Sequence, residues 1–198
     1  MKVAKELLCG AMVLAMAASA AAPAGATTLR RLGLDELVAT NRAVVVGEVV
    51  DARSYWNEDH TFILTDVRIA MHDVLKGDVG REELTITLMG GEVGEMTALI
   101  VGGARLVPGN SYLLFLDEEK LPGIGRALTV REHSQGAFDI KIGRGGLRAV
   151  SQANGHPLVP DRQGYTEAPG GPEGMHLNTM MQSVRQIVAR ERARKEVQ

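Results

Sequence analysis

The stretch VLKGDVGREELTITLMGGEVGEM, residues 74–96, decides the fold class that this sequence predicts. It contains the end of an apolar run, a Lys-Gly turn, the alternating segment LTITL and a glycine-rich loop. Leu84, Ile86 and Leu88 share one face of LTITL and two threonines share the other, which is the two-residue period of a half-buried strand. The stretch therefore predicts two strands joined by a tight turn, followed by a loop whose role has to be decided.

The glycine-rich loop MGGEVGEM, residues 89–96, lacks the features of a phosphate site. A P-loop needs a lysine after its last glycine and a helix after the lysine, and this loop has no lysine and no helical pattern behind it. Its two glutamates would also repel phosphate. Because glycine lets a chain turn sharply between strands, Gly90, Gly91 and Gly94 predict a barrel corner, and a loop at such a corner can also contact a partner.

Apolar and β-branched segments on both sides of this stretch predict further strands. Residues 43–56, AVVVGEVVDARSYW, are apolar on both faces at first, as expected of a central strand, and Gly47 marks a bend. From 61 to 75 apolar side chains alternate with polar ones. Shorter or weaker strands are predicted at 98–106, with an interruption at Gly102-Gly103, and at 112–116, 127–131, 137–142 and 147–150. Short strands separated by turn residues are typical of an antiparallel barrel or sandwich.

Helical patterns flank these strands and complete a single domain. A short helix is predicted around 33–38, and residues 27–150 form the barrel. Residues 151–175 are rich in proline and glycine and predict a long loop. Residues 176–198 carry an apolar stripe at helical spacing, which predicts an amphipathic helix that packs on the barrel. The stripe consists of Leu177, Met180, Met181, Val184, Ile187 and Val188.

Residues 1–26 have the pattern of a secretory signal peptide. Two lysines precede an apolar run from 7 to 18, small residues follow, and cleavage fits after Ala26 or after Ala20. The run is shorter than the roughly 20 residues that span a bilayer, so no stable membrane anchor is expected after cleavage. Cys9, the only cysteine, lies in this segment, so the exported fold has to be stable by packing without disulfides. The sequence predicts a periplasmic or secreted protein.

Charge and motifs point away from nucleic-acid binding and catalysis. Twenty-two basic residues stand against 24 acidic ones, which is not the charge balance of a nucleic-acid-binding domain. The histidines show no metal-binding spacing, so no metal site and no cofactor are expected. They are His60, His72, His133, His156 and His176. His133 and Ser134 are adjacent on a predicted strand and would point to opposite faces, and no G-x-S-x-G motif occurs, so no catalytic site is expected.

Residues 43–116 resemble the netrin-like module of tissue inhibitors of metalloproteinases and of related bacterial exported proteins. The matching features are AVVVGEVV, a long second strand ending in VLKG, LTITL with its glycine corner, and PGNSYLLFL. The resemblance implies an OB-like five-stranded β-barrel. In those inhibitors a cysteine at the mature N-terminus presents its amine and carbonyl to the zinc of a protease. Thr27 is the expected first residue here, and no cysteine remains to fix it in place.

The sequence therefore predicts a mainly β protein, an OB-like antiparallel barrel that acts by binding another protein and not as an enzyme. The partner would lie in the periplasm or outside the cell, with a peptidase as one candidate. Tyr55 and Trp56, at the end of the strand 43–56, form either an exposed contact patch or rings that close the end of the barrel. The candidate partner-binding residues are Thr27, Thr28, Tyr55, Trp56, Gly90, Gly91 and Gly94. The alternative function is a metallopeptidase inhibitor that acts through its mature N-terminus and adjacent loops.

Overall fold

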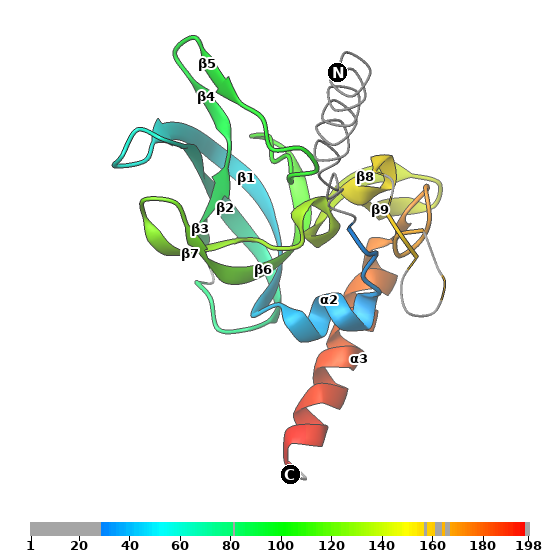
Figure 1. Ribbon diagram of the computed structural model, residues 1–198. Helices are drawn as coiled ribbons and strands as arrows, with labels where there is room; N and C mark the ends of the chain where they lie inside the picture. The colour runs from blue at the N-terminus through cyan, green and yellow to red at the C-terminus, as the bar shows by residue number, and fades with distance from the viewer. Residues whose placement is uncertain (1–28, 81, 157, 161–163, 165–166, 197–198) are drawn as a thin grey trace, which may run out of the picture.

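The computed structural model describes residues 29–80, 82–156, 158–160, 164 and 167–196. The predicted signal peptide, residues 1–26, and the candidates Thr27 and Thr28 lie outside this part of the chain. Within it, two helices and ten strands are arranged as in Figure 1. The elements are α2 (Leu34–Thr40), β1 (Ala43–Trp56), β2 (Ile63–Lys76), β3 (Glu83–Met89), β4 (Gly91–Val93), β5 (Met96–Ala98), β6 (Ser111–Leu121), β7 (Gly125–Val130), the 3-10 helix η1 (His133–Gly136), β8 (Ala137–Gly143), β9 (Gly146–Ser151), the 3-10 helix η2 (Gln152–Gly155), β10 (Met175–His176) and α3 (Leu177–Glu196).

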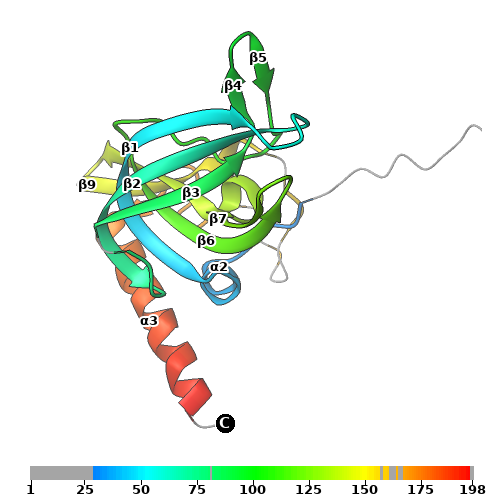
Figure 2. The same ribbon diagram turned by 90° about the vertical axis from the view of Figure 1, so that its left-hand side faces the viewer.

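One large antiparallel sheet organises the molecule. Its strands follow the order β10-β9-β8-β6-β1-β2-β3, and β7 pairs with the same edge of β6 that β8 uses. Strands β4 and β5 form a separate two-stranded hairpin. The hairpin projects from one end of the molecule, and α3 extends from the opposite end (Figures 1 and 2). The mainly β class, the antiparallel pairing and the two flanking helices that the sequence predicts are confirmed.

The closed barrel that the sequence predicts does not form. Strands β1, β2, β3, β6 and β7 curl round a common interior (Figure 2), and Cα atoms of β3 and β7 come within 8 Å of each other. No ladder joins these two strands in the described part of the chain. The reason is that β6 shares one edge between β7 and β8, and β8 with β9 then extends the sheet away from β3. The sheet is therefore strongly curved but open.

Strand β1 is apolar on both faces because it separates two hydrophobic cores. Val44 and Val46 face α2 and α3, and Ala43, Val45 and Val49 face the interior of the curved sheet. Side chains alternate between the two faces of a strand, so each set meets its own core. The pairing of β1 with β2 shifts register between Val44 and Val45 and between Val46 and Gly47. The central position predicted for this strand is confirmed, since β6 and β2 flank it.

The helix-facing core contains the largest fully buried side chains. Phe115 of β6 and Phe138 of β8 are fully buried, with ring centroids 5.8 Å apart. Along α3, the side chains of Met180 and Val184 are fully buried against this core, and Ile187 and Val188 are nearly so. The apolar stripe predicted for the C-terminal helix is thus the face by which α3 packs.

The Lys-Gly turn ties the two helices to the sheet. Lys76, the last residue of β2, donates a hydrogen bond to the carbonyl oxygen of Val38 in α2 and forms an ion pair of 3.3 Å with Glu191 in α3. Gly77 has a φ of +91°, and a Cβ there would lie 2.7 Å from the carbonyl oxygen of Arg42. Both residues of this turn are therefore needed to bring the end of β2 against the helices.

Three segments differ from the prediction. The strand expected at 98–106 ends at Ala98, because Ile100 begins a turn in which Gly102 has a φ of +75° and the Gly103 amide donates to the Ile100 carbonyl. His133 and Ser134 lie in the 3-10 helix η1 and not on a strand. Parts of the predicted loop 151–175 are regular, since η2 spans 152–155 and Met175 pairs with β9.

Candidate functional site: an open groove beside the β4–β5 hairpin

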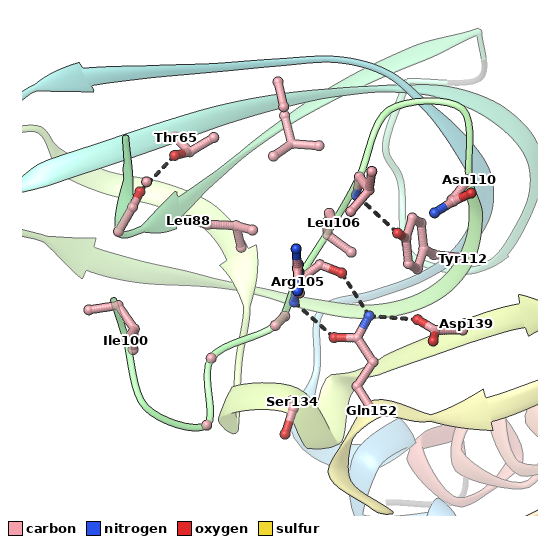
Figure 3. Close-up of a pocket in the computed structure, with 18 of the residues that line it drawn as sticks. Thr65, Leu88, Ile100, Arg105, Leu106, Asn110, Tyr112, Ser134, Asp139 and Gln152 are labelled. Carbon is pink, nitrogen blue, oxygen red and sulfur yellow. Dashed lines mark hydrogen bonds between the residues drawn. The ribbon is translucent and has the colours of Figure 1, made fainter. Parts of the chain in front are cut away.

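A broad groove opens at the end of the curved sheet opposite α3. It encloses about 1300 Å³ and lies between the β4–β5 hairpin, the segment 99–110 and the β8–β9–η2 region (Figure 3). Leu88 and Tyr112 line its inner end, and Ser134, Asp139 and Gln152 line the side formed by η1, β8 and η2.

Glycines create both the corner and the hairpin. Gly90 and Gly91, with φ angles of +90° and +135°, turn the chain from β3 into β4, and both line the groove. A Cβ at Gly91 would overlap the hydroxyl oxygens of Ser54 and Thr65, so only glycine fits. Gly94, with a φ of +61°, occupies the first central position of the two-residue β4–β5 turn, where a type II′ turn requires glycine. Gly94 does not line the groove.

Two hydroxyl groups attach the hairpin to the sheet. Thr65 of β2 donates a 2.6 Å hydrogen bond to the carbonyl oxygen of Gly90, and Ser54 of β1 accepts one of 3.3 Å from the Glu92 amide. The hydroxyl oxygens of Ser54 and Thr65 are themselves 2.9 Å apart. The base of the hairpin is therefore positioned by side chains of the two longest strands.

Two side chains hold the middle of the segment 99–110, and backbone hydrogen bonds from Ser134 to Gly102 and between Val49 and residues 109–110 hold its ends. The amide group of Gln152 accepts a hydrogen bond from the Arg105 amide and donates one to the Arg105 carbonyl, both 2.8 Å long, as a neighbouring strand would (Figure 3). The amide nitrogen of Gln152, Nε2, also donates a hydrogen bond of 2.7 Å to the Asp139 carboxylate. Tyr112 accepts from the Val107 amide through its hydroxyl group at 2.9 Å. The segment is fixed while its outer side chains stay in solvent.

Three exposed side chains between the end of the hairpin and the start of this segment are apolar. Leu99 and Val101 are each 83% exposed, and Met96 is 58% exposed. Between them, Ile100 is half-buried, and the turn it begins is closed by the Gly103 amide and braced by a 2.8 Å hydrogen bond from the Ser134 amide to the Gly102 carbonyl. The hairpin side of the groove thus carries a braced turn with an apolar outer surface.

Tyr55 and Trp56 do not line the groove. Both rings are half-buried at the end of β1. The Tyr55 hydroxyl donates to Asp66 at 3.1 Å, and the same carboxylate oxygen accepts from Thr87 at 2.7 Å. Burial raises the pKa of the Tyr55 phenol above 10.0, and the negative charge of Asp66 and the hydrogen bond to it raise the pKa further. Trp56 stacks on His60 of the β1–β2 turn, with ring centroids 6.4 Å apart.

The chain just after the predicted signal peptide is held at two points. Buried Gln135 of η1 accepts a 2.8 Å hydrogen bond from the Leu32 amide and donates one of 3.0 Å to the Arg30 carbonyl. Val159 exchanges 3.0 Å backbone bonds with Leu29 and Arg31. Since Ser134 of the same 3-10 helix lines the groove, this segment is anchored next to one side of it. Gln135 and Gln152 carry no signal in the sequence, because an amide side chain that fixes a backbone segment looks like any other polar residue. Val159 carries none because it acts only through its backbone.

The described residues do not bring the histidines together. They contain no group of three or more His, Cys, Asp or Glu side chains arranged to hold a metal ion. His156 lines the groove, and Ser134, which also lines it, is 3% exposed and follows His133 in η1. Among the helices of the described residues, none combines the length and apolar character that crossing a bilayer requires.

Comparisons with known proteins give no match. Neither a scan of protein-family models nor searches of the curated proteins and of solved structures find a protein similar to this chain.

Proposed function

We propose that this chain is an exported, non-catalytic protein-binding module that contacts its partner through the turn 99–101 and the adjacent groove. The observation that carries the proposal is the exposure of Leu99 and Val101, each 83%, on a turn that is fixed from behind. Burying such side chains in a partner removes apolar surface from water, which favours association. Because the turn is already ordered, little conformational entropy would be lost on binding.

The strand order supports an OB-like module as the scaffold for this surface. In the order β3-β2-β1-β6-β7 the first and last strands approach each other, as in a five-stranded barrel with one open seam. We propose that this part of the sheet corresponds to the netrin-like module that residues 43–116 resemble. The helices and the strands β8 to β10 would then be additions around it.

A site-specific cross-linking experiment tests the proposed surface. A photoreactive amino acid replaces Leu99 in one variant and Ile142 in a second. Ile142 is the matched control because it is 89% exposed and apolar but does not line the groove. On irradiation with exported proteins of the native host, position 99 should form a discrete adduct that position 142 does not form. Equal labelling at the two positions, or no adduct at position 99, contradicts the proposal.

A metallopeptidase inhibitor is the second candidate function. It is favoured by one observation, that Leu29 to Leu32 are held by Gln135 and Val159 beside the groove. A mature N-terminus at Thr27 would begin two residues before this anchored segment. The resemblance to netrin-like inhibitors implies that the terminal amine and carbonyl would approach the zinc of a peptidase.

Adding one residue to the N-terminus tests the inhibitor hypothesis. If the mature protein inhibits a zinc peptidase, one alanine placed before Thr27 should abolish inhibition, because the amine is displaced from the metal. A variant with Leu99→Ser keeps the free N-terminus and measures the contribution of the turn separately. Inhibition that survives the added alanine rules out chelation by the N-terminus.

A further inference from the structure

The outer edge of β5 has free hydrogen-bonding groups. Glu92 and Thr97 are cross-strand partners in the β4–β5 hairpin, and the Glu92 amide points away from β5, since it donates to Ser54. Glu92 and Thr97 are therefore a non-hydrogen-bonded pair of the antiparallel ladder. In such a pair both residues direct their backbone N–H and C=O groups away from the partner strand. The Thr97 groups therefore point away from β4. Within the described residues, no backbone hydrogen bond outside the strand ladders reaches Thr97 or Leu99.

The two edges of the hairpin differ in this respect. The outer edge of β4 lies against β1, where the Ser54 hydroxyl accepts a hydrogen bond from the Glu92 amide. Among the described residues, no hydrogen bond from another element reaches the outer edge of β5 at Thr97, and the exposed apolar side chains of Met96 and Leu99 flank it. An unpaired strand edge is a template for another strand, and proteins that bind extended peptides use an exposed sheet edge in this way.

The free edge lies beside the groove. Glu92, Thr97 and Leu99 share one face of the hairpin, because side chains alternate along a strand and cross-strand partners face the same way. All three residues line the groove. A strand added to β5 would consequently direct every second side chain into the groove, where Leu88 and Ile100 provide apolar contacts.

Charge at the hairpin indicates what kind of segment fits. Glu92 and Glu95 are exposed, and neither forms an ion pair among the described residues. The hairpin residues 91–98 include no basic residue. Of the two lysine and arginine side chains that line the groove, Lys141 is matched by Asp139 at 2.7 Å, and Arg105 lies on the segment 99–110 and not on the hairpin. The hairpin end is therefore locally acidic, which favours a segment with a basic side chain at that end.

We infer that an extended segment of a partner protein adds as a strand to the free edge of β5, with alternate apolar side chains in the groove and a basic side chain beside Glu92 and Glu95. This inference rests on the proposed protein-binding function and specifies its mode. Backbone hydrogen bonds to Thr97 and Leu99 would supply affinity that does not depend on sequence, and the groove and the glutamates would supply specificity.

A peptide library gives a defined probe. Random linear dodecapeptides displayed on phage are selected against the purified mature protein, and the best binder is synthesised. We expect selected sequences to alternate apolar residues and to carry lysine or arginine near one end. N-methylation of alternate backbone amides of that peptide should weaken binding about ten-fold or more at the positions that pair with β5, because each methyl group removes a donor and blocks the edge.

Variants of the hairpin separate the contributions. Thr97→Pro removes the outward N–H but leaves the β4–β5 ladder intact, because that N–H takes no part in it, and proline is tolerated at such edge positions. It should weaken binding about ten-fold, equivalent to about 1.4 kcal/mol, while Thr97→Val binds as the wild type does. Glu95→Lys should weaken binding of the basic peptide, and the exposed Glu119→Lys on β6 is the charge-matched control. Circular dichroism and thermal unfolding verify that each variant is folded.

The outcomes distinguish failure of the mode from failure of the function. If Leu99→Ser abolishes peptide binding and Thr97→Pro leaves it unchanged, protein binding stands and strand addition is overturned. A library that yields no binder also overturns the inference, while cross-linking at position 99 still decides the function. If the wild type forms a dimer that Thr97→Pro converts to a monomer, the edge pairs with a second copy of the chain and the inference about a partner segment is wrong.

Discussion

The two ends of the curved sheet handle apolar side chains in opposite ways. Against α2 and α3, Phe115, Phe138 and Met180 are completely buried, and an ion pair between Lys76 and Glu191 joins sheet to helix. At the groove, Leu99 and Val101 are 83% exposed on a segment that two polar side chains, Gln152 and Tyr112, and a few backbone bonds hold. One end is fixed by packing, and the other is fixed by hydrogen bonds with its apolar side chains outward.

This difference has an energetic consequence. Packing at the helix end contributes to the stability of the whole domain, because apolar area removed from water is the main favourable term in folding. The exposed side chains of Leu99 and Val101 contribute little to folding, because they remain hydrated. These side chains are therefore available to contact a partner. Substitutions at the two ends should separate effects on folding from effects on binding.

The largest expected effect comes from the helix-facing core. Phe138→Ala removes a fully buried ring that packs on Phe115, so it should lower the free energy of unfolding by about 3–5 kcal/mol. Leu99→Ala is the matched control, and its effect should stay within about 0.5 kcal/mol because the side chain is exposed. Urea denaturation of both variants measures the contrast. Similar losses for the two would show that the turn 99–101 is part of the folding core.

A smaller effect is expected where the sheet bends. At Gly47 a Cβ would lie 2.6 Å from the carbonyl oxygen of Ala70 and 2.6 Å from Cγ2 of Ile69. Gly47→Ala should therefore cost about 1–3 kcal/mol, because the backbone of β2 has to move. In contrast, a Cβ at Gly94 meets nothing within 4 Å, so Gly94→Ala should cost only the roughly 1–2 kcal/mol of a positive φ. The same denaturation experiment ranks the two glycines, and a larger loss at Gly94 would contradict the close approach at Gly47.

The sequence predicted the helix end better than the groove end, for a physical reason. Alternation in LTITL and the stripe of α3 follow from burial, and burial leaves a periodic signal. Ile69, Ile86, Leu114 and Phe138, which all lie on predicted strands, are buried. Phe138 belongs to the helix-facing core and the other three to the interior of the curved sheet. The segment 98–106 misled the prediction because apolar residues next to glycine are compatible with both a strand and an exposed turn.

The groove itself depends on contacts that leave no pattern in the chain. Gln152 bonds to Arg105 across 47 residues, and Gln135 bonds to Leu32 across 103. A glutamine that replaces a strand neighbour cannot be distinguished in sequence from a solvated one. The open seam between β3 and β7 also leaves no pattern in the sequence. It depends on which residues of β6 pair with β7 and which pair with β8.

These two glutamines give a further test of the difference between the helix end and the groove end. Gln135→Ala leaves the buried Leu32 amide without its acceptor, so it should cost about 1–2 kcal/mol. Gln152→Ala should cost less than about 1 kcal/mol, because water can reach the Arg105 backbone at the exposed groove. Hydrogen exchange should show faster exchange of the Leu32 amide in the first variant and of the Arg105 amide in the second. Exchange that spreads through α3 in the second variant would show that the groove is coupled to the helix end.

The smallest expected effect is on the pKa of Tyr55, which lies near the end of β1. Its pKa is raised above 10.0, first by burial and then by Asp66, so folding favours the neutral phenol. The sign follows from linkage: this stabilisation is complete below pH 10.0 and is lost as pH rises through the pKa of the folded state. Asp66→Asn removes the negative charge and should lower the Tyr55 pKa toward its ordinary value, as ultraviolet titration of tyrosinate would show, with Tyr55→Phe identifying the signal. If Asp66→Asn leaves that titration unchanged, burial alone sets the pKa, and packing near the end of β1 protects Tyr55, as the helix end protects its core.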